Sequence, residues 1–251
     1  MKIAVITGAS SGLGREYAAQ LAENFPEVDR VWLIARRKPL LDELAGTLSI
    51  KAECLPLDLM DDGDLSALSR KLETEKPEVT LLVNCAGCGY LSNVEDTDLE
   101  LLTRMTDLNM RALTAVTRIV LPYIGTGGHI INVSSIASFC PNARMTVYSS
   151  TKAYVSSFTL GLRDELRGRK ISCTAICSGP MATEFLDIGG IKGNSKMFQT
   201  LPYCDPVKVA AGSYRAAKLG RAFYTPRAFF KLYRFLAKII PSTIMVRLAR
   251  T

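Results

Sequence analysis

The sequence predicts an α/β protein with one doubly wound, mostly parallel sheet of about seven strands, flanked by helices and forming a single domain. Short apolar runs alternate with longer segments of helical periodicity, as in parallel sheets that helices cover on both faces. A glycine-rich segment follows the first apolar run. The chain has 251 residues, 48% of them apolar, which is enough for one large core.

The predicted strands are runs rich in β-branched residues, typical of strands buried on both faces. They lie at 2–7, 30–35, 52–57, 79–84, 129–134 and 171–176. The predicted helices lie at 13–24, 39–48, 64–75, 98–121 and 147–168. A helix at about 205–219 and a short strand near 221–225 would close the sheet. Ligands of such sheets bind at the carboxyl ends of the strands.

The domain is expected to span residues 1–226, including a substrate lid at 181–204. The lid segment has two adjacent glycines, a third soon after, and large apolar residues without a clean period, which indicates a mobile loop rather than a core element. Residues 227–251 are expected to form a basic amphipathic helical tail.

The net charge of +7 is concentrated in that tail, which contains no Asp or Glu and whose basic residues are Arg227, Lys231, Arg234, Lys238, Arg247 and Arg250. The rest of the chain is nearly neutral, which argues against a nucleic-acid-binding surface. The first four basic residues share one helix face. Such a helix could lie on an anionic membrane, pack on a partner subunit, or dock over a substrate pocket with its arginines in water, but it is too short and too charged to span a bilayer.

The amino terminus shows no pattern of a signal peptide, and the seven scattered cysteines do not form a disulfide framework. We therefore expect a cytoplasmic protein with free thiols, which could also lie peripherally at a membrane through its tail. Cys85 and Cys88 form CAGC without a second ligand pair, so we expect coincidence rather than a metal or redox site. His129, at the presumed amino end of a strand, is expected at the surface.

The glycine-rich segment TGASSGLG comprises Gly8, Ser10, Ser11, Gly12, Leu13 and Gly14. Glycines at a strand-to-helix turn permit positive φ and close backbone approach, and the helix amino terminus offers free N–H groups to a pyrophosphate. The segment thus predicts dinucleotide binding in a Rossmann-like fold, although a mere turn would have similar glycines.

The second predicted strand ends with Arg36 and Arg37, where an NAD-selective site would carry an acidic residue. Guanidinium groups suit a phosphate monoester, so the expected cofactor is NADP(H). Alternatively the two arginines simply sit in solvent. Asp58, with Leu59 beside it, is placed to accept a hydrogen bond from the adenine amino group, or else caps the next helix.

Several further segments carry residues suited to carbonyl chemistry. Residues 84–87 read NCAG, and YSSTK places Tyr148 and Lys152 one helical turn apart. With TGxxxGxG, Asn109, and a serine at 135 thirteen residues before Tyr148, the sequence resembles the classical short-chain dehydrogenase/reductase family over residues 1 to about 185. It departs from the family at Cys85, where the family has an asparagine, and at residues 178–183, which read SGPMAT where the family has PGxxxT.

The resemblance implies a role for each matched position. Tyr148 would be the general acid in reduction and the base in oxidation, Lys152 would hold the nicotinamide ribose and lower the pKa of the phenol, and Ser135 would bind the substrate oxygen. A phenol titrates near ~10, so nearby positive charge is needed to favour phenolate. Asn109 would anchor a water of the proton relay. The remaining implied cofactor contacts are Asn84, Ala86, Gly87, Pro180, Met181 and Thr183.

The predicted lid offers the apolar residues Met181, Phe185, Leu186, Ile188, Ile191, Met197, Phe198 and Leu201. An apolar roof suits a hydrophobic ketone or alcohol such as a steroid, bile acid or fatty-acyl chain, although these residues could equally serve only to pack the lid. The tail differs from the glycine-rich ending of 3-oxoacyl-carrier-protein reductases and looks more like the hydroxysteroid and long-chain ketoacyl reductase branch.

These observations predict an NADP(H)-dependent oxidoreductase that interconverts a hydrophobic ketone and its secondary alcohol, working mainly as a reductase. The alternatives are a 3-oxoacyl (fatty-acyl) reductase, or a non-catalytic NADP-binding sensor or scaffold. The family often pairs subunits through helices corresponding to 98–121 and 147–168, which implies a homodimer or homotetramer. We expect no metal and no nucleic-acid partner.

Overall fold

In the computed structural model, which describes residues 1–191 and 193–248, the described residues form a sheet of seven parallel strands. The strand order is β3-β2-β1-β4-β5-β6-β7. The strands are β1 Lys2–Thr7, β2 Arg30–Ile34, β3 Lys51–Leu55, β4 Glu78–Asn84, β5 Ile124–Val133, β6 Ser172–Ile176 and β7 Phe223–Tyr224. The predicted doubly wound, single-domain fold is confirmed.

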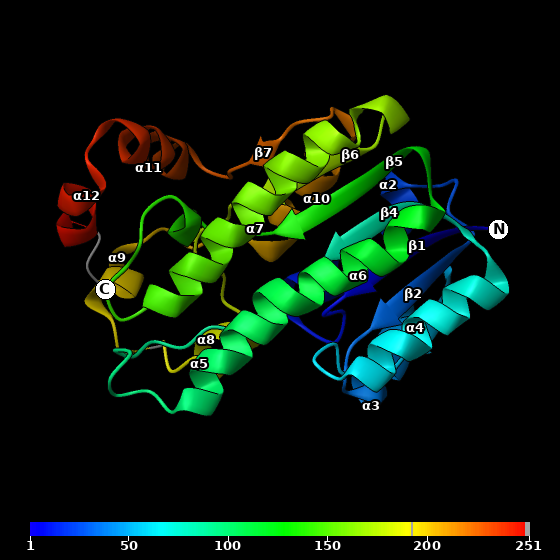
Figure 1. The fold of residues 1–251 in the computed structure, drawn as a ribbon, viewed down its shortest axis with the longest axis horizontal. Helices are drawn as coiled ribbons and strands as arrows, with labels where there is room; N and C mark the ends of the chain where they lie inside the picture. Colours follow the sequence, from blue (N-terminus) through cyan, green and yellow to red (C-terminus); the bar gives the residue numbers. More distant parts are fainter. Residues whose placement is uncertain (192, 249–251) are drawn as a thin grey trace.

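Helices connect the strands and also occur in residues 181–204, the segment predicted to be a lid, and in the tail (Figure 1). The α-helices are α1 Gly12–Ala19, α2 Leu21–Asn24, α3 Lys38–Thr47, α4 Asp62–Glu75, α5 Leu99–Thr106, α6 Leu113–Val120, α7 Thr146–Glu165, α8 Glu184–Ile188, α9 Lys196–Thr200, α10 Pro206–Lys218, α11 Ala228–Ile239 and α12 Ser242–Leu248. A π-helix, Asp107–Ala112, joins α5 to α6, and short 3-10 turns lie at Leu121–Tyr123, Ile136–Ser138 and Arg167–Arg169.

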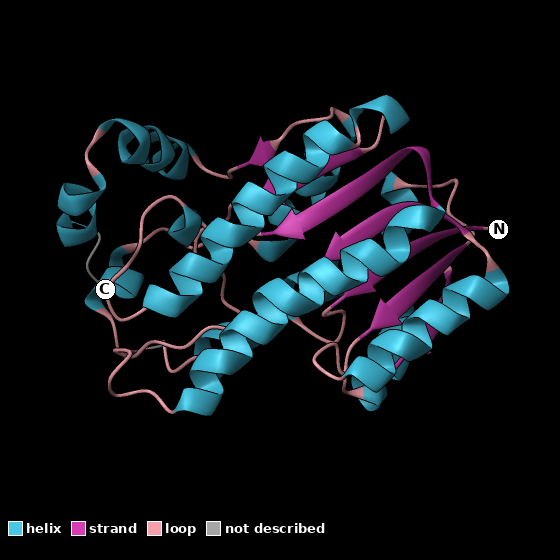
Figure 2. Cartoon of the chain, in the orientation of Figure 1, coloured by secondary structure: helices cyan, strands magenta, loops and turns pink. Residues whose placement is uncertain are grey.

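Helices cover both faces of the sheet, so its strands are buried on both sides (Figure 2). Side chains of α1, α3 and α10 pack on one face, and side chains of α4, α6 and α7 pack on the other. This arrangement explains why the strand sequences are continuous apolar runs rather than alternating patterns. Trp32 of β2 is fully buried in the second of these cores.

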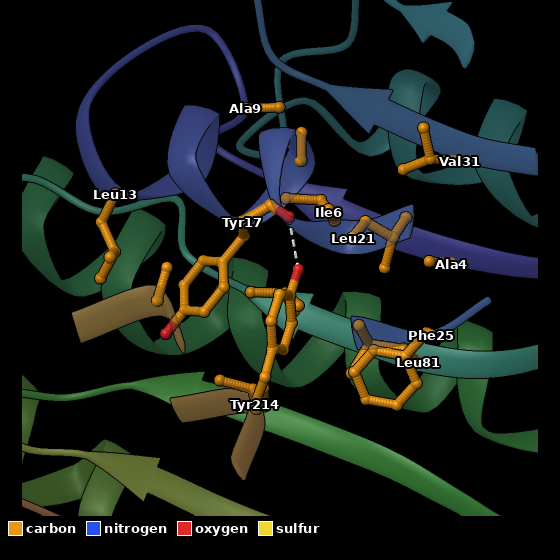
Figure 3. Packing of buried hydrophobic residues seen from close by; sticks show 14 of the residues in the cluster. Ala4, Ile6, Ala9, Leu13, Tyr17, Leu21, Phe25, Val31, Leu81 and Tyr214 are labelled. Atoms are coloured by element: carbon orange, nitrogen blue, oxygen red, sulfur yellow. Dashed lines mark hydrogen bonds between the residues drawn. The ribbon is translucent and has the colours of Figure 1, made fainter. Parts of the chain in front are cut away.

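Two tyrosines hold α1 against α10 (Figure 3). The rings of Tyr17 and Tyr214 lie 5.3 Å apart, and the Tyr214 hydroxyl donates a hydrogen bond to the backbone carbonyl of Tyr17. Phe25 packs edge-on against Tyr214. All three side chains are fully buried, and burial of each contributes on the order of 2 kcal/mol. The contact joins the helix that follows the glycine segment to the helix before the last strand.

The order of the strands reverses between β1 and β4, and this switch point determines where ligands bind. The turn after β1 therefore lies beside the carboxyl ends of β4 and β5. The lid helices α8 and α9 and the tail helices α11 and α12 lie at the same end of the molecule, far from the amino terminus (Figure 1).

Several elements differ from the sequence prediction. The helix expected at 98–121 is interrupted by the π-helix, and β5 begins at Ile124 with a register shift against β4 between Val79 and Leu81. The tail forms two helices because Pro241 has no N–H to continue the first one. The lid segment forms two short helices, with Leu186 and Ile191 buried in a cluster that also contains Tyr148.

The seven cysteines, all within the described residues, are free thiols, as expected. His129 lies on β5 at the amino side of the sheet, but the surface position expected for it is wrong. It is half-buried, shares a 2.7 Å hydrogen bond with the Ser172 hydroxyl and packs edge-on against Phe25. Across the part of the chain that the structure describes, every helix is too short or too polar to cross a membrane.

Candidate active site

The glycine segment forms a bare backbone cradle between β1 and α1. Gly8 has a φ of +68°, and a Cβ there would lie 2.8 Å from the Ala86 nitrogen. A Cβ on Gly14 would lie 2.1 Å from the Gly8 carbonyl oxygen. Within the described residues, the side chain of Ser11 makes no capping hydrogen bond to α1. The first N–H groups of this helix are thus available to an anion, and the cradle fits a dinucleotide pyrophosphate.

Arg36 and Arg37 follow β2 at one end of the cavity, each close to a carboxylate. Arg37 donates to the Ser10 hydroxyl at 3.2 Å and to a Glu184 carboxylate oxygen at 2.8 Å, and Arg36 lies 3.8 Å from Asp58. All four charged side chains of these two pairs are partly exposed. The arginine pair is placed where it could hold a phosphate beside the cradle.

Asp58 does not cap the helix that follows it, so that alternative is wrong. The cap of α4 is Asp61, which accepts a hydrogen bond from the Asp64 nitrogen at 2.9 Å. Asp58 instead accepts from the Met60 nitrogen at 3.0 Å and, with Leu59, lines the cavity. Its position is compatible with the predicted adenine contact.

Asn84 ends β4 beneath the cavity rather than on its wall. Its amide nitrogen donates to Asn132 of β5 at 2.8 Å and to Thr117 of α6 at 2.9 Å, and Asn132 donates to Thr159 of α7 at 3.0 Å. Asn84 is only 3% exposed, and it is not among the lining residues. The Asn84 side chain thus joins β4 to β5 and α6, and the cofactor contact expected for Asn84 stays a prediction, while Ala86 and Gly87 do line the cavity.

Asn109 lies in the π-helix, whose wider turn directs it toward the segment after β4. Its amide nitrogen donates to the Cys88 carbonyl at 2.8 Å and to the Thr151 hydroxyl at 3.0 Å, and its oxygen accepts from the Cys88 nitrogen at 2.9 Å. Both amide N–H groups thus have protein partners, and Asn109 is buried and is not among the residues that line the cavity. It positions Cys88 and α7, and its part in a proton relay stays a prediction.

Tyr148, Lys152 and Ser135 all line the cavity and lie close together, as YSSTK and the serine thirteen residues before it predicted. Tyr148 and Lys152 lie one turn apart on α7, with the Lys152 nitrogen 5.8 Å from the centre of the phenol ring. Ser135 follows β5, interacts with the Tyr148 hydroxyl and accepts from the Ala137 nitrogen at 3.1 Å. Ser134 instead donates to the Lys152 carbonyl, which fits the structural role expected for it.

Burial dominates the ionisation of this group of residues. It raises the pKa of Tyr148 to about 12, against the hydrogen bond from Ser135, which lowers it. Burial also lowers the pKa of Lys152 to about 8, although the Lys152 ammonium donates to the Val133 carbonyl at 2.8 Å. Lys152 lies beside the ring, and the lowering of the phenol pKa expected from it stays a prediction. A further positive charge beside the ring is needed to favour phenolate.

The charge on Lys152 should lower the stability of the cofactor-free protein. Its folded pKa of about 8 lies below the ordinary value of 10.5, so stability should rise with pH between these values. The buried charge costs about 3 kcal/mol at pH 7. Lys152→Met should raise the cofactor-free melting temperature at pH 7 by several degrees, and the gain should disappear near pH 10.5.

Differential scanning fluorimetry across this pH range tests the prediction, with Lys208→Met as the matched control. Lys208 lies exposed on α10, so its replacement should leave the melting temperature nearly unchanged. A Lys152→Met protein that melts below the wild type at pH 7 would show that the ammonium stabilises the fold.

The cavity has a volume of about 830 Å³ and extends from the arginine pair past Tyr148 to the tail. Seven of the eight apolar lid residues line it, and Ile191 instead packs in the cluster beneath. All the other predicted site residues of the glycine segment, the strand ends and the SGPMAT segment line the cavity as well. The cavity is mainly apolar beyond Tyr148, where Met145, Phe185 and the tail form its walls.

Several contacts that the sequence analysis did not predict also shape the site. Glu184 begins α8 and ties the lid to Arg37, and Phe185 packs against Tyr148 with ring centres 5.6 Å apart. Thr151 accepts a hydrogen bond from Asn109. Because these contacts join segments far apart in the chain, local periodicity carries no signal for them. Only the adjacency of Glu184 to Thr183 could have drawn attention to it.

Comparisons with known proteins agree with this geometry. The short chain dehydrogenase family model matches residues 2–188. Sulfoacetaldehyde reductase 2 of Chromohalobacter salexigens is 35% identical over 192 residues, covering 73% of this chain and 74% of the relative.

Two solved structures show the same fold over nearly the whole chain. A short-chain dehydrogenase from Sphingobium yanoikuyae in complex with NADPH has a TM-score of 0.80 and 26% identity, covering 96% of this chain and 97% of the other. A 3-ketoacyl-(acyl-carrier-protein) reductase from Brucella melitensis complexed with NADH has a TM-score of 0.77 and 25% identity, covering 90% and 96%. With the glycine cradle and the Tyr148 site already in place, the family match shows that this chain belongs to the short-chain dehydrogenase family of oxidoreductases.

Proposed function

We propose that the protein is an NADP(H)-dependent oxidoreductase that interconverts a hydrophobic ketone and its secondary alcohol. The observation that carries this proposal is the convergence of Ser135, Tyr148 and Lys152 in one cavity, between the glycine cradle and an apolar chamber. A dinucleotide lying along the cradle would bring its reactive ring to these residues, and the chamber would hold the ketone.

The residues of the chain supply position and a proton. Ser135 donates a hydrogen bond to the carbonyl oxygen, and Tyr148 transfers its hydroxyl proton to that oxygen as negative charge develops there. Lys152 provides a fixed positive charge beside the phenol, held by the Val133 carbonyl. The bound nicotinamide supplies the hydride. Cellular NADPH pools are kept reduced, which favours ketone reduction.

The choice of NADP(H) rests on the arginine pair. Arg36 and Arg37 take the place where an NAD-selective site carries a carboxylate, and both guanidinium groups face the end of the cavity that would hold the adenosine ribose. The solved relatives include NADPH-bound and NADH-bound proteins, so support for NADP(H) comes from these side chains rather than from the family.

The apolar chamber favours a bulky hydrophobic substrate such as a hydroxysteroid or bile acid, with residues 181–204 acting as the lid over it. The second candidate is a 3-oxoacyl (fatty-acyl) reductase, which the likeness to the Brucella reductase supports. Loss of NADPH absorbance with steroid ketones, bile-acid ketones and 3-oxoacyl thioesters decides between them. NADPH binding without turnover of any ketone would instead favour a sensor or scaffold.

We also propose that the protein self-associates through α5, α6 and α7, as the resemblance implies. Leu99 and Leu160, on α5 and α7, are 74% and 43% exposed and are candidates for such a contact. Size-exclusion chromatography with light scattering should give the mass of a dimer or tetramer, and Leu160→Glu should reduce it. A wild-type protein of monomeric mass would contradict this part of the proposal.

A further inference from the structure

Helix α11 is apolar on two opposite sides, although only one side packs on the protein. Phe230 is fully buried, and Tyr233 packs beside it against Phe139 at the inner side of the helix. Leu232, Phe235 and Ile239 lie on the opposite side at the spacing of one helical face and are 56%, 59% and 62% exposed. An outward apolar stripe on a helix that already has a packed inner face indicates a second contact.

Cations border this outward stripe. Lys231 and Lys238 are exposed, and they lie about two helical turns apart on the flank of the stripe formed by Leu232, Phe235 and Ile239. The sequence from 227 to 251 contains no Asp or Glu. Arg234, in contrast, is partly buried, because its guanidinium stacks 3.9 Å from the centre of the Phe223 ring and anchors the helix to β7. An apolar stripe edged by lysines is the pattern of a helix that lies in a membrane interface.

The cavity opens beside this stripe. Phe229, Leu236 and Leu248 line the cavity and are also 54%, 37% and 68% exposed, so they form the rim of its mouth. Tail helices α11 and α12 stand at the carboxyl ends of the strands, next to the lid (Figure 1). A surface that covered the outward stripe would therefore also face the entrance to the apolar chamber.

We propose that the outward face of α11, formed by Lys231, Leu232, Phe235, Lys238 and Ile239, rests on an anionic lipid bilayer and directs the cavity mouth toward it. A hydrophobic ketone dissolved in the lipid then enters the chamber without crossing water. The proposal that α11 binds the bilayer depends only on the tail, whereas the proposal that the ketone enters from the bilayer rests on the proposed function.

Charge favours a lipid surface over a second copy of the chain as the occupant. A symmetric contact between two such faces would bring lysines together with no acidic residue of the tail to pair with them, and like charges brought close are repelled. Anionic headgroups provide the missing negative charge, and the acyl boundary accepts the aromatic and aliphatic side chains. The helix has 12 residues, which suits lying in the interface rather than spanning it.

Co-sedimentation of the full chain with vesicles tests the docking. The wild type should bind vesicles of phosphatidylcholine with phosphatidylglycerol, bind phosphatidylcholine alone at least about tenfold more weakly, and be released by high salt. Leu232→Ser/Phe235→Ser/Ile239→Ser and Lys231→Glu/Lys238→Glu should each weaken binding at least about tenfold. The matched control, Leu219→Ser/Lys208→Glu, changes an exposed leucine and an exposed lysine of another helix region and should bind like the wild type.

Three outcomes would overturn the docking proposal. The first is a wild-type protein that stays in the supernatant when either kind of vesicle is sedimented. The second is a pair of tail variants that bind vesicles as tightly as the control. The third is a serine variant that has a lower mass than the wild type by light scattering without lipid. The last result would assign the face to a second copy of the chain.

Kinetics with vesicles test the entry step. With anionic vesicles present, the serine variant should show a KM for a lipid-partitioning ketone raised at least about fivefold, but an unchanged KM for a small water-soluble ketone. None of its three substituted residues lines the cavity. An unchanged KM for both ketones would exclude entry from the bilayer. Vesicle binding without turnover of any ketone would leave the docking in place and contradict the proposed enzyme function instead.

Discussion

Tyr148→Phe is expected to lower kcat about 10²- to 10⁴-fold, because the ring would stay in place while the only proton that it can transfer is removed. The hydroxyl is buried at the centre of the cavity and interacts with Ser135. Ketone reduction should be followed by NADPH absorbance, and NADPH binding by fluorescence titration. The Kd for NADPH should remain nearly unchanged, since the cradle and the arginine pair are untouched.

Tyr154→Phe is the matched control for this experiment. Tyr154 lies on the same helix, and its hydroxyl hydrogen-bonds with Thr114 at 2.7 Å, away from the cavity. It should keep near wild-type turnover. If Tyr148→Phe retained most of its activity while the control behaved as expected, Tyr148 would not be the proton donor.

Arg36→Ala/Arg37→Ala should lower kcat/KM for NADPH about 10²-fold or more, while changing kcat/KM for NADH little. Two charge-assisted hydrogen bonds to a phosphate contribute about 1.5 kcal/mol each at the lower end, and together they give a factor of this size. Only NADPH carries the 2′-phosphate that the two guanidinium groups would hold. Initial rates with each cofactor at a saturating ketone concentration provide the measurement.

Arg111→Ala controls for the loss of surface charge, because Arg111 pairs with Asp62 on an exposed surface outside the cavity. Its cofactor preference should match that of the wild type. Equal losses with NADPH and NADH in the double variant would show that the arginines act on the fold or on the shared pyrophosphate. A wild type that prefers NADH would contradict the choice of cofactor itself.

Much of the architecture follows from local sequence. Strands buried on both faces leave continuous apolar runs, and the glycine turn and the YSSTK helix are also local patterns, so their positions could be predicted. The π-helix at Asp107–Ala112 could not, since it depends on the fit of Asn109 against Cys88 rather than on helix periodicity. The direction of the Asn84 side chain could not be predicted either, because it depends on a hydrogen bond to Asn132, which is distant in the sequence.

The electrostatics of the site could be predicted only in part. The sequence indicated that a lysine accompanies the phenol, but the degree of burial that raises the pKa of Tyr148 and lowers that of Lys152 depends on packing by the lid and β5. The environment of Arg234 likewise depends on where the tail folds back, because its partner Phe223 belongs to the last strand.

The Asn84–Asn132 pair has a consequence for protein engineering. The pair links neighbouring strands at matched register, and its threonine partners fasten α6 and α7 to the same point. This polar cluster in the apolar sheet therefore fixes α6, which continues from the π-helix with Asn109, and α7, which carries Tyr148. If Ser135, Tyr148 and Lys152 were transferred to another scaffold, this hydrogen-bonded cluster would be missing. We expect that the angle between the two helices would be reproduced only if Asn84, Asn132, Thr117 and Thr159 were transferred as well.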